Sequence, residues 1–227
     1  MGYFIILGFF TLVGWFVSSR LKSKFNKYSK IGIRSGLSGA EIAQEMLRHY
    51  GVYDVKITQG NGYLTDHYNP LTKTVTLSPT VYSGRSIAAA AVAAHECGHA
   101  VQHATAYPAL QMRSNLVPVV QFSSTIQQYL FFGMIVGLGA GIGGNLLLLI
   151  LTVTFGITAL FSLVTLPVEF DASKRALLWL DESGMTHGAE YDGAKDALWW
   201  AAMTYVSQAL ASLVVFMYFL LQFLGND

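Results

Sequence analysis

Apolar positions along this chain gather in three long stretches that contain no Asp, Glu, Lys or Arg. They run from Met1 to Ser19, from Ser114 to Val168 and from Ala197 to Asn226. A helix needs roughly 20 residues to cross a bilayer, so each outer stretch can hold one span and the middle stretch can hold two. The pattern therefore predicts about four transmembrane helices, at residues 3–18, 121–141, 145–166 and 203–224.

The segments between these spans carry mixed patterns that are typical of a small α+β unit. Ser38-Gly-Ala-Glu41 is a capping box and predicts a helix that ends near Tyr50. Apolar alternation then predicts three strands, at residues 52–58, 62–68 and 74–78. An Ala-rich run predicts a helix over residues 86–105, which Tyr107-Pro108 closes. We expect a further helix at 167–180, a loop through 183–191, and a helix that continues into the last span.

Composition and charge placement support a membrane protein and predict its orientation. The chain is 53% hydrophobic and 12% charged, which excludes an ordinary soluble domain. Every Lys and Arg lies in residues 20–113 or 174–195, and the positive-inside tendency puts both segments in the cytoplasm. The basic cluster follows the first span, which favours a retained anchor over a cleaved signal peptide. A net charge of +1 indicates no nucleic-acid partner.

The candidate chemistry lies in His95-Glu96-Cys97-Gly98-His99, an H-E-x-x-H motif. On a helix, residues i and i+4 share a face, so His95 and His99 can bind one zinc ion. Glu96 can then act as the general base toward a metal-bound water. Cys97 is the single cysteine, so an internal disulfide is excluded, and we expect a small buried residue rather than a redox switch.

A catalytic zinc needs a third protein ligand, for which three residues compete. His103 continues the helical stripe, but it lies about 12 Å along the axis from His95, too far to share an ion. Glu169 is the favoured ligand because it follows the third span on the expected cytoplasmic side. Asp171 faces roughly 200° away from Glu169 on a helix, so both would not bind the same ion. We expect His103 and Asp171 to serve other purposes.

The chain resembles the YugP-like neutral zinc metallopeptidases of bacterial membranes. The residues that carry the resemblance are Leu64-Thr-Asp-His-Tyr68, Gly84-Arg-Ser-Ile87, Ala93-Ala-His-Glu-Cys-Gly-His99, Leu163-Val-Thr-Leu-Pro-Val-Glu-Phe-Asp-Ala-Ser173 and Ala201-Ala-Met-Thr-Tyr205. A more distant likeness is to membrane proteases of the HtpX and CAAX-prenyl protease type, whose third ligand is the first Glu of an E-x-x-A-D-like segment. Glu169 matches that Glu. Ser173 stands where the final acid is expected, which puts in doubt the carboxylate that would orient a His ligand.

The expected fold is an α-helical membrane protein with a small zincin-like cytoplasmic α+β domain that carries the H-E-x-x-H helix. Its expected parts are an anchor (1–19), the peptidase domain (20–113), a transmembrane hairpin (114–166), cytoplasmic helices with the third ligand (167–202) and a last span (203–227). The expected function is a zinc endopeptidase of the bacterial plasma membrane, acting on protein or peptide substrates at the cytoplasmic surface.

Two alternatives stay open. One is an intramembrane metalloprotease, and the other is a non-catalytic, zinc-stabilised scaffold. An oxyanion also needs a donor, for which His67, His187 and Tyr205 are candidates. Gly133, Gly137 and Gly141 form a small-xxx-small face that could pack against a partner protein or another copy, although packing within the chain is favoured.

Overall fold

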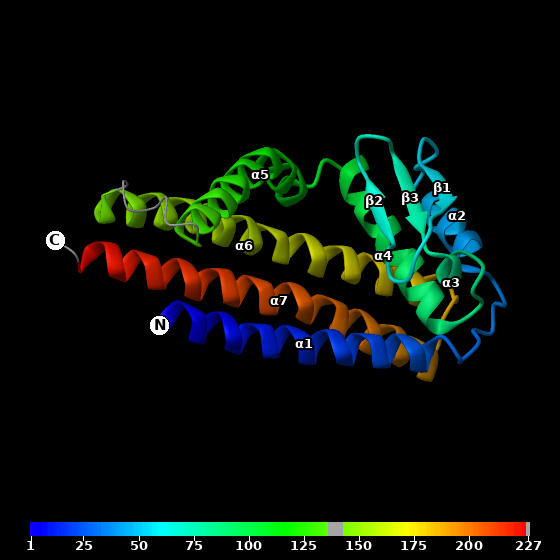
Figure 1. Ribbon diagram of the computed structural model, residues 1–227. Coiled ribbons are helices and arrows are strands. Elements are labelled where there is room, and N and C mark those ends of the chain that lie inside the picture. Colours follow the sequence, from blue (N-terminus) through cyan, green and yellow to red (C-terminus); the bar gives the residue numbers. More distant parts are fainter. Residues whose placement is uncertain (136–142, 226–227) are drawn as a thin grey trace. The chain divides into compact units, whose positions relative to one another are not determined.

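The computed structural model describes residues 1–135 and 143–225, and the chain forms two compact units. One unit comprises residues 1–16, 111–166 and 204–227, and the other comprises 17–110 and 167–203. Four of the described helices contribute residues to both units (Figure 1). They are α1 (Gly2–Tyr28), α5 (Pro108–Ile135), α6 (Gly144–Glu182) and α7 (Ala189–Leu224).

The protein is mostly helical, and three helices among the described residues are long and apolar enough to cross a membrane. They are α1, α6 and α7. The predicted second span is only partly described, because residues 121–135 belong to α5 and residues 136–141 lie outside the described part, as do Gly137 and Gly141. The number of four spans therefore stays a prediction.

The helices are longer than the sequence pattern suggested. Span 145–166 and the predicted helix 167–180 form one continuous helix, α6, which runs through Pro167. The basic run after the first predicted span likewise continues α1 as far as Tyr28. An apolar span can extend into polar solvent as the same helix, since only the side chains change at the boundary.

The second unit begins with the predicted capping box. Helix α2 spans Gly39–His49, the Ser38 side chain accepts a hydrogen bond from the Glu41 amide, and the Glu41 carboxylate accepts one from the Ser38 amide at 2.7 Å. The prediction of this helix is confirmed. Its apolar face packs against the Ala-rich helix α4 (Ile87–Ala104), which follows the short helix α3 (Pro79–Tyr82).

A three-stranded sheet lies beside these helices, with strand order β1-β3-β2 (Figure 1). Strand β1 (Lys56–Gln59) pairs in parallel with β3 (Thr74–Leu77), and β2 (His67–Asn69) pairs antiparallel with β3. The predicted strand over 62–68 was wrong for most of its length. Gly62 and Leu64 have φ angles of 95° and 57°, and this left-handed backbone is incompatible with an extended strand.

Helix α4 is the centre of this unit. Ser86 caps its first turn by accepting from the Ala89 amide, and its Ala side chains are almost all buried. The Cys97 thiol is buried and donates to the carbonyl oxygen of Ala43 on α2. Burial raises the pKa of this thiol, so Cys97 is an inert packing residue, as the sequence predicted.

Helix α6 crosses α4 at Gly98. A Cβ atom built on Gly98 would lie 2.6 Å from the carbonyl oxygen of Ala172, so only glycine allows the two backbones to approach this closely. Because Gly98 lies between the two motif histidines and Ala172 lies one turn after Glu169, this crossing brings both segments to one place.

Candidate metal centre

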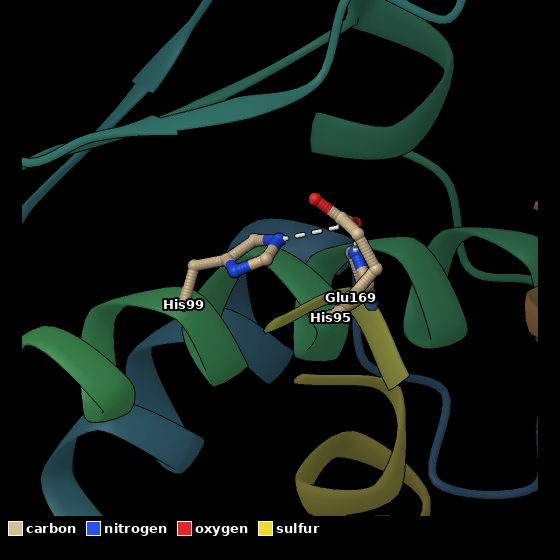
Figure 2. Close-up of side chains that lie close together, drawn as sticks. All are labelled: His95, His99 and Glu169. Carbon is tan, nitrogen blue, oxygen red and sulfur yellow. Dashed lines mark ion pairs between the residues drawn. The ribbon is translucent and has the colours of Figure 1, made fainter. Parts of the chain in front are cut away.

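The crossing of α4 and α6 places the three predicted zinc ligands around one point. His95 and His99 project from α4, and Glu169 projects from α6 (Figure 2). The Nε2 atoms of His95 and His99 lie 3.4 and 3.6 Å from Oε2 of Glu169, and one donor atom of each residue lies within 4.8 Å of the others. The side chains are 12%, 10% and 2% exposed, in the order His95, His99, Glu169.

These distances and donors suit a zinc ion. Bonds of about 2.0–2.1 Å in tetrahedral geometry separate neighbouring ligand atoms by roughly 3.3 Å. Two imidazole nitrogens and one carboxylate oxygen are a ligand set of catalytic zinc sites, in which a fourth position is left for water. The electrostatics of the site also favour a cation. Burial by itself would lower the pKa of His99, but the carboxylates of Glu169 and Glu96 have the larger combined effect and raise that pKa. The buried carboxylates thus favour positive charge at this point.

Each histidine is also held at its far nitrogen. Oγ of Ser173 lies 3.1 Å from Nδ1 of His95, and Oε1 of Gln102 lies 3.0 Å from Nδ1 of His99. Such contacts orient metal-binding imidazoles. At this position the related proteases are expected to carry an acidic residue. Here the hydroxyl of Ser173 contacts His95 instead.

Asp171 and His103 lie outside the ligand cluster. Oδ2 of Asp171 accepts hydrogen bonds from Arg175 Nε at 2.5 Å and from Gln102 Nε2 at 2.8 Å. Nδ1 of His103 is 2.8 Å from the hydroxyl oxygen of Tyr68 on β2. Both residues were expected to serve purposes other than metal binding, and both have polar partners of their own.

Glu96 follows His95 on α4 and is buried. Burial raises the pKa of its carboxyl group; His95 and His99 act in the opposite direction, and the carboxylates of Glu169 and Asp66 raise it further. Asp66, which precedes β2, accepts hydrogen bonds from the amide and hydroxyl of Ser78 at 2.7 and 3.0 Å. A buried carboxyl group beside the metal ligands with a raised pKa is suited to accept a proton near neutral pH.

The three expected oxyanion donors lie on different segments of the chain. His67 is exposed on β2, with Nδ1 2.9 Å from the carbonyl oxygen of Thr65. His187 lies in the loop between α6 and α7, close to Gly184. Tyr205 belongs to the other compact unit. The choice among these three residues stays a prediction.

Sequence reasoning missed Gln102. The spacing could have predicted this contact, because a Gln three residues after a His lies near that His on the same helix. It is also a fully buried amide on a helix that otherwise buries mostly Ala, and a buried amide requires partners.

Comparison with known proteins decides the family. A family model described as "Putative neutral zinc metallopeptidase" matches residues 3–224, nearly the entire chain. The chain belongs to this family. Zinc is accordingly the metal that the His95–His99–Glu169 cluster is suited to hold.

A relative of known sequence also supports a membrane protease. This zinc metallopeptidase family member is 44% identical over 210 residues to a Bacillus subtilis protein named "Putative membrane protease YugP". The matched region covers 92% of this chain and 91% of the relative. No solved structure matches the chain. The family, the relative's name and the three apolar helices support a protease role in a membrane.

Proposed function

We propose that the protein is a membrane-embedded zinc endopeptidase that hydrolyses peptide bonds of protein substrates at the cytoplasmic membrane surface. His95, His99 and Glu169 hold the metal, and Glu96 is the general base. The observation that carries the proposal is the convergence of two helix-borne imidazoles and one carboxylate within 4.8 Å, in a chain of a zinc metallopeptidase family.

Each residue has a defined part in this mechanism. Zinc bound at the cluster would supply a Lewis acid for a water molecule and for the scissile carbonyl. Glu96 accepts a proton from that water as it attacks, and afterwards donates the proton to the leaving amine nitrogen. The raised pKa of Glu96 suits the first step, because a carboxyl group that binds a proton more firmly is a stronger base. Ser173 and Gln102 keep the two imidazoles oriented.

The proposed orientation rests on the basic residues. All Lys and Arg lie in segments 20–113 and 174–195, so we assign both to the cytoplasm of a bacterial cell and both termini to the outside. Residues 20–113 and 167–202 then form the peptidase part. Residues 1–19, 114–166 and 203–227 form the membrane part.

An extended substrate needs a free strand edge. Strand β3 directly precedes the α3–α4 segment, but it is central and pairs with strands on both sides, so it cannot accept a further strand. Strand β2 is an edge strand and contacts α4. We therefore propose that a substrate adds to β2, where main-chain hydrogen bonds would hold it near the motif helix.

The test is Glu96→Gln, with Glu45→Gln on α2 as a matched control. Gln is nearly isosteric with Glu and cannot accept the proton of the water, so Glu96→Gln should bind zinc and fold normally. Its rate of peptide hydrolysis should fall by about 10²–10⁴. Glu45→Gln should cleave like the wild type, because Glu45 pairs with Arg48 on the same helix.

Two results would count against the proposal. Equal cleavage by the wild type and Glu96→Gln would remove Glu96 from the chemistry. If zinc-loaded wild type cleaves nothing while a partner protein depends on it for stability, the protein is a scaffold. Cleavage confined to residues within a substrate's transmembrane helix would instead indicate an intramembrane protease.

A further inference from the structure

Gln102 is a fully buried amide between α4 and α6, with 0% of its surface exposed. Its Oε1 lies 3.0 Å from Nδ1 of His99. Its Nε2 donates two hydrogen bonds of 2.8 Å, one to the carbonyl oxygen of Val168 and one to Oδ2 of Asp171. Gln102 thus connects a proposed metal ligand on α4 with the α6 segment that carries Glu169.

These contacts determine which way the amide points. A main-chain carbonyl oxygen can only accept a hydrogen bond, so the group facing Val168 must be the NH₂ end of Gln102. The carboxylate of Asp171 can likewise only accept a hydrogen bond, so it too must face the NH₂ group of Gln102. Oε1 therefore faces His99, and because an amide oxygen can only accept, Nδ1 of His99 must carry the proton. The Nε2 lone pair of His99 is then directed to the side of Glu169, where the metal would bind.

The amide is held in this orientation by charged residues. Asp171 also accepts from Arg175 Nε at 2.5 Å, and the Arg175 guanidinium lies 5.7 Å from the ring centroid of Tyr107. Rotating the Gln102 amide by 180° would place its oxygen against the carboxylate of Asp171 and the carbonyl oxygen of Val168. Two repulsive contacts would then replace two hydrogen bonds, so one orientation is strongly favoured.

We propose that Gln102 is a positioning residue that holds His99 with its proton on Nδ1 and its Nε2 available to the metal, and that Asp171 and Arg175 hold Gln102. The inference rests on the proposed metal centre. A hydrogen-bond acceptor at the far nitrogen fixes the imidazole and increases its basicity as a ligand, and loss of such a partner costs roughly 10–100-fold in metal affinity.

The experiment measures zinc affinity of the full-length protein in detergent, by competition with a chromophoric chelator. Gln102→Leu removes every hydrogen bond at similar volume and should weaken zinc binding about 10–100-fold. Gln44→Leu, on the exposed face of α2, is the matched control and should bind zinc like the wild type.

Wild-type affinity in Gln102→Leu would overturn the inference. A readout on the wild type keeps the test decisive if a variant does not fold. In zinc-loaded protein labelled with ¹⁵N-histidine, His99 should be metal-bound at Nε2 and protonated at Nδ1, and binding through Nδ1 would overturn the inference. Failure of the wild type to bind zinc would instead refute the metal centre itself.

Discussion

Replacing Gly98 by Ala tests whether the close crossing of α4 and α6 builds the metal centre. Gly98 lies between His95 and His99, and Ala172 faces it from α6. A Cβ atom at residue 98 would lie 2.6 Å from the carbonyl oxygen of Ala172 and 3.1 Å from its Cα atom. Both neighbours are main-chain atoms, so no side chain can rotate away to relieve the contact.

The size of the effect follows from these distances. Real Cβ contacts are essentially never shorter than 3.0 Å, so the helices must separate locally by at least about 0.4 Å. Metal–ligand distances tolerate only about 0.2 Å, and Glu169 lies one helical turn from Ala172 and moves with it. Ala gains about 1 kcal/mol over Gly in a helix interior, whereas overpacking costs about 1–3 kcal/mol, so the fold should survive.

We therefore expect Gly98→Ala to keep its helical circular dichroism and to lose at least about tenfold in zinc affinity, which corresponds to about 1.4 kcal/mol. The assay is zinc competition with a chelator, beside a thermal unfolding curve of the metal-free protein. Gly14→Ala is the control, since no described atom lies within 4 Å of a Cβ at that helical position. Wild-type zinc affinity in Gly98→Ala would refute the argument that this approach sets the ligand distances.

Two further predictions concern the ligands and the orientation. Glu169→Ala should lose most of the bound zinc in metal analysis of the purified protein. His103→Ala should retain it, because His103 pairs with Tyr68 and is not one of the clustered ligands. Full zinc occupancy in Glu169→Ala would refute the assignment of Glu169 as a ligand. A cysteine placed at Thr72, after replacement of Cys97, should resist an impermeant thiol reagent in intact cells, and rapid labelling there would reverse the proposed orientation.

Local sequence patterns were sufficient for those features that depend on neighbouring residues. The Ser38–Glu41 capping box, the Ala-rich helix and the H-E-x-x-H spacing were all read correctly, because caps and helical faces involve residues three or four positions apart. The apolar stretches likewise identified three helices that can span a membrane. The prediction of a strand over 62–68 was wrong for most of its length, because alternation of apolar residues does not reveal the left-handed backbone at Gly62 and Leu64.

The proposed third ligand, Glu169, shows what tertiary structure adds to local patterns. Spacing left Glu169 and Asp171 as competitors, and their separation depends on the face that α6 turns toward α4. That face is set by the contact of Gly98 with Ala172, which are 74 positions apart in the numbering.

The same crossing decides how the histidines are held. Ser173 and Gln102 contact the Nδ1 atoms of His95 and His99, and Asp171 acts on Gln102 rather than on a metal ion. The chain by itself thus determined which residues can bind zinc, since side-chain chemistry and helical period are local. Only tertiary structure decided which of them meet and which groups contact each imidazole, because hydrogen-bond partners and close backbone approaches join segments that are distant along the chain.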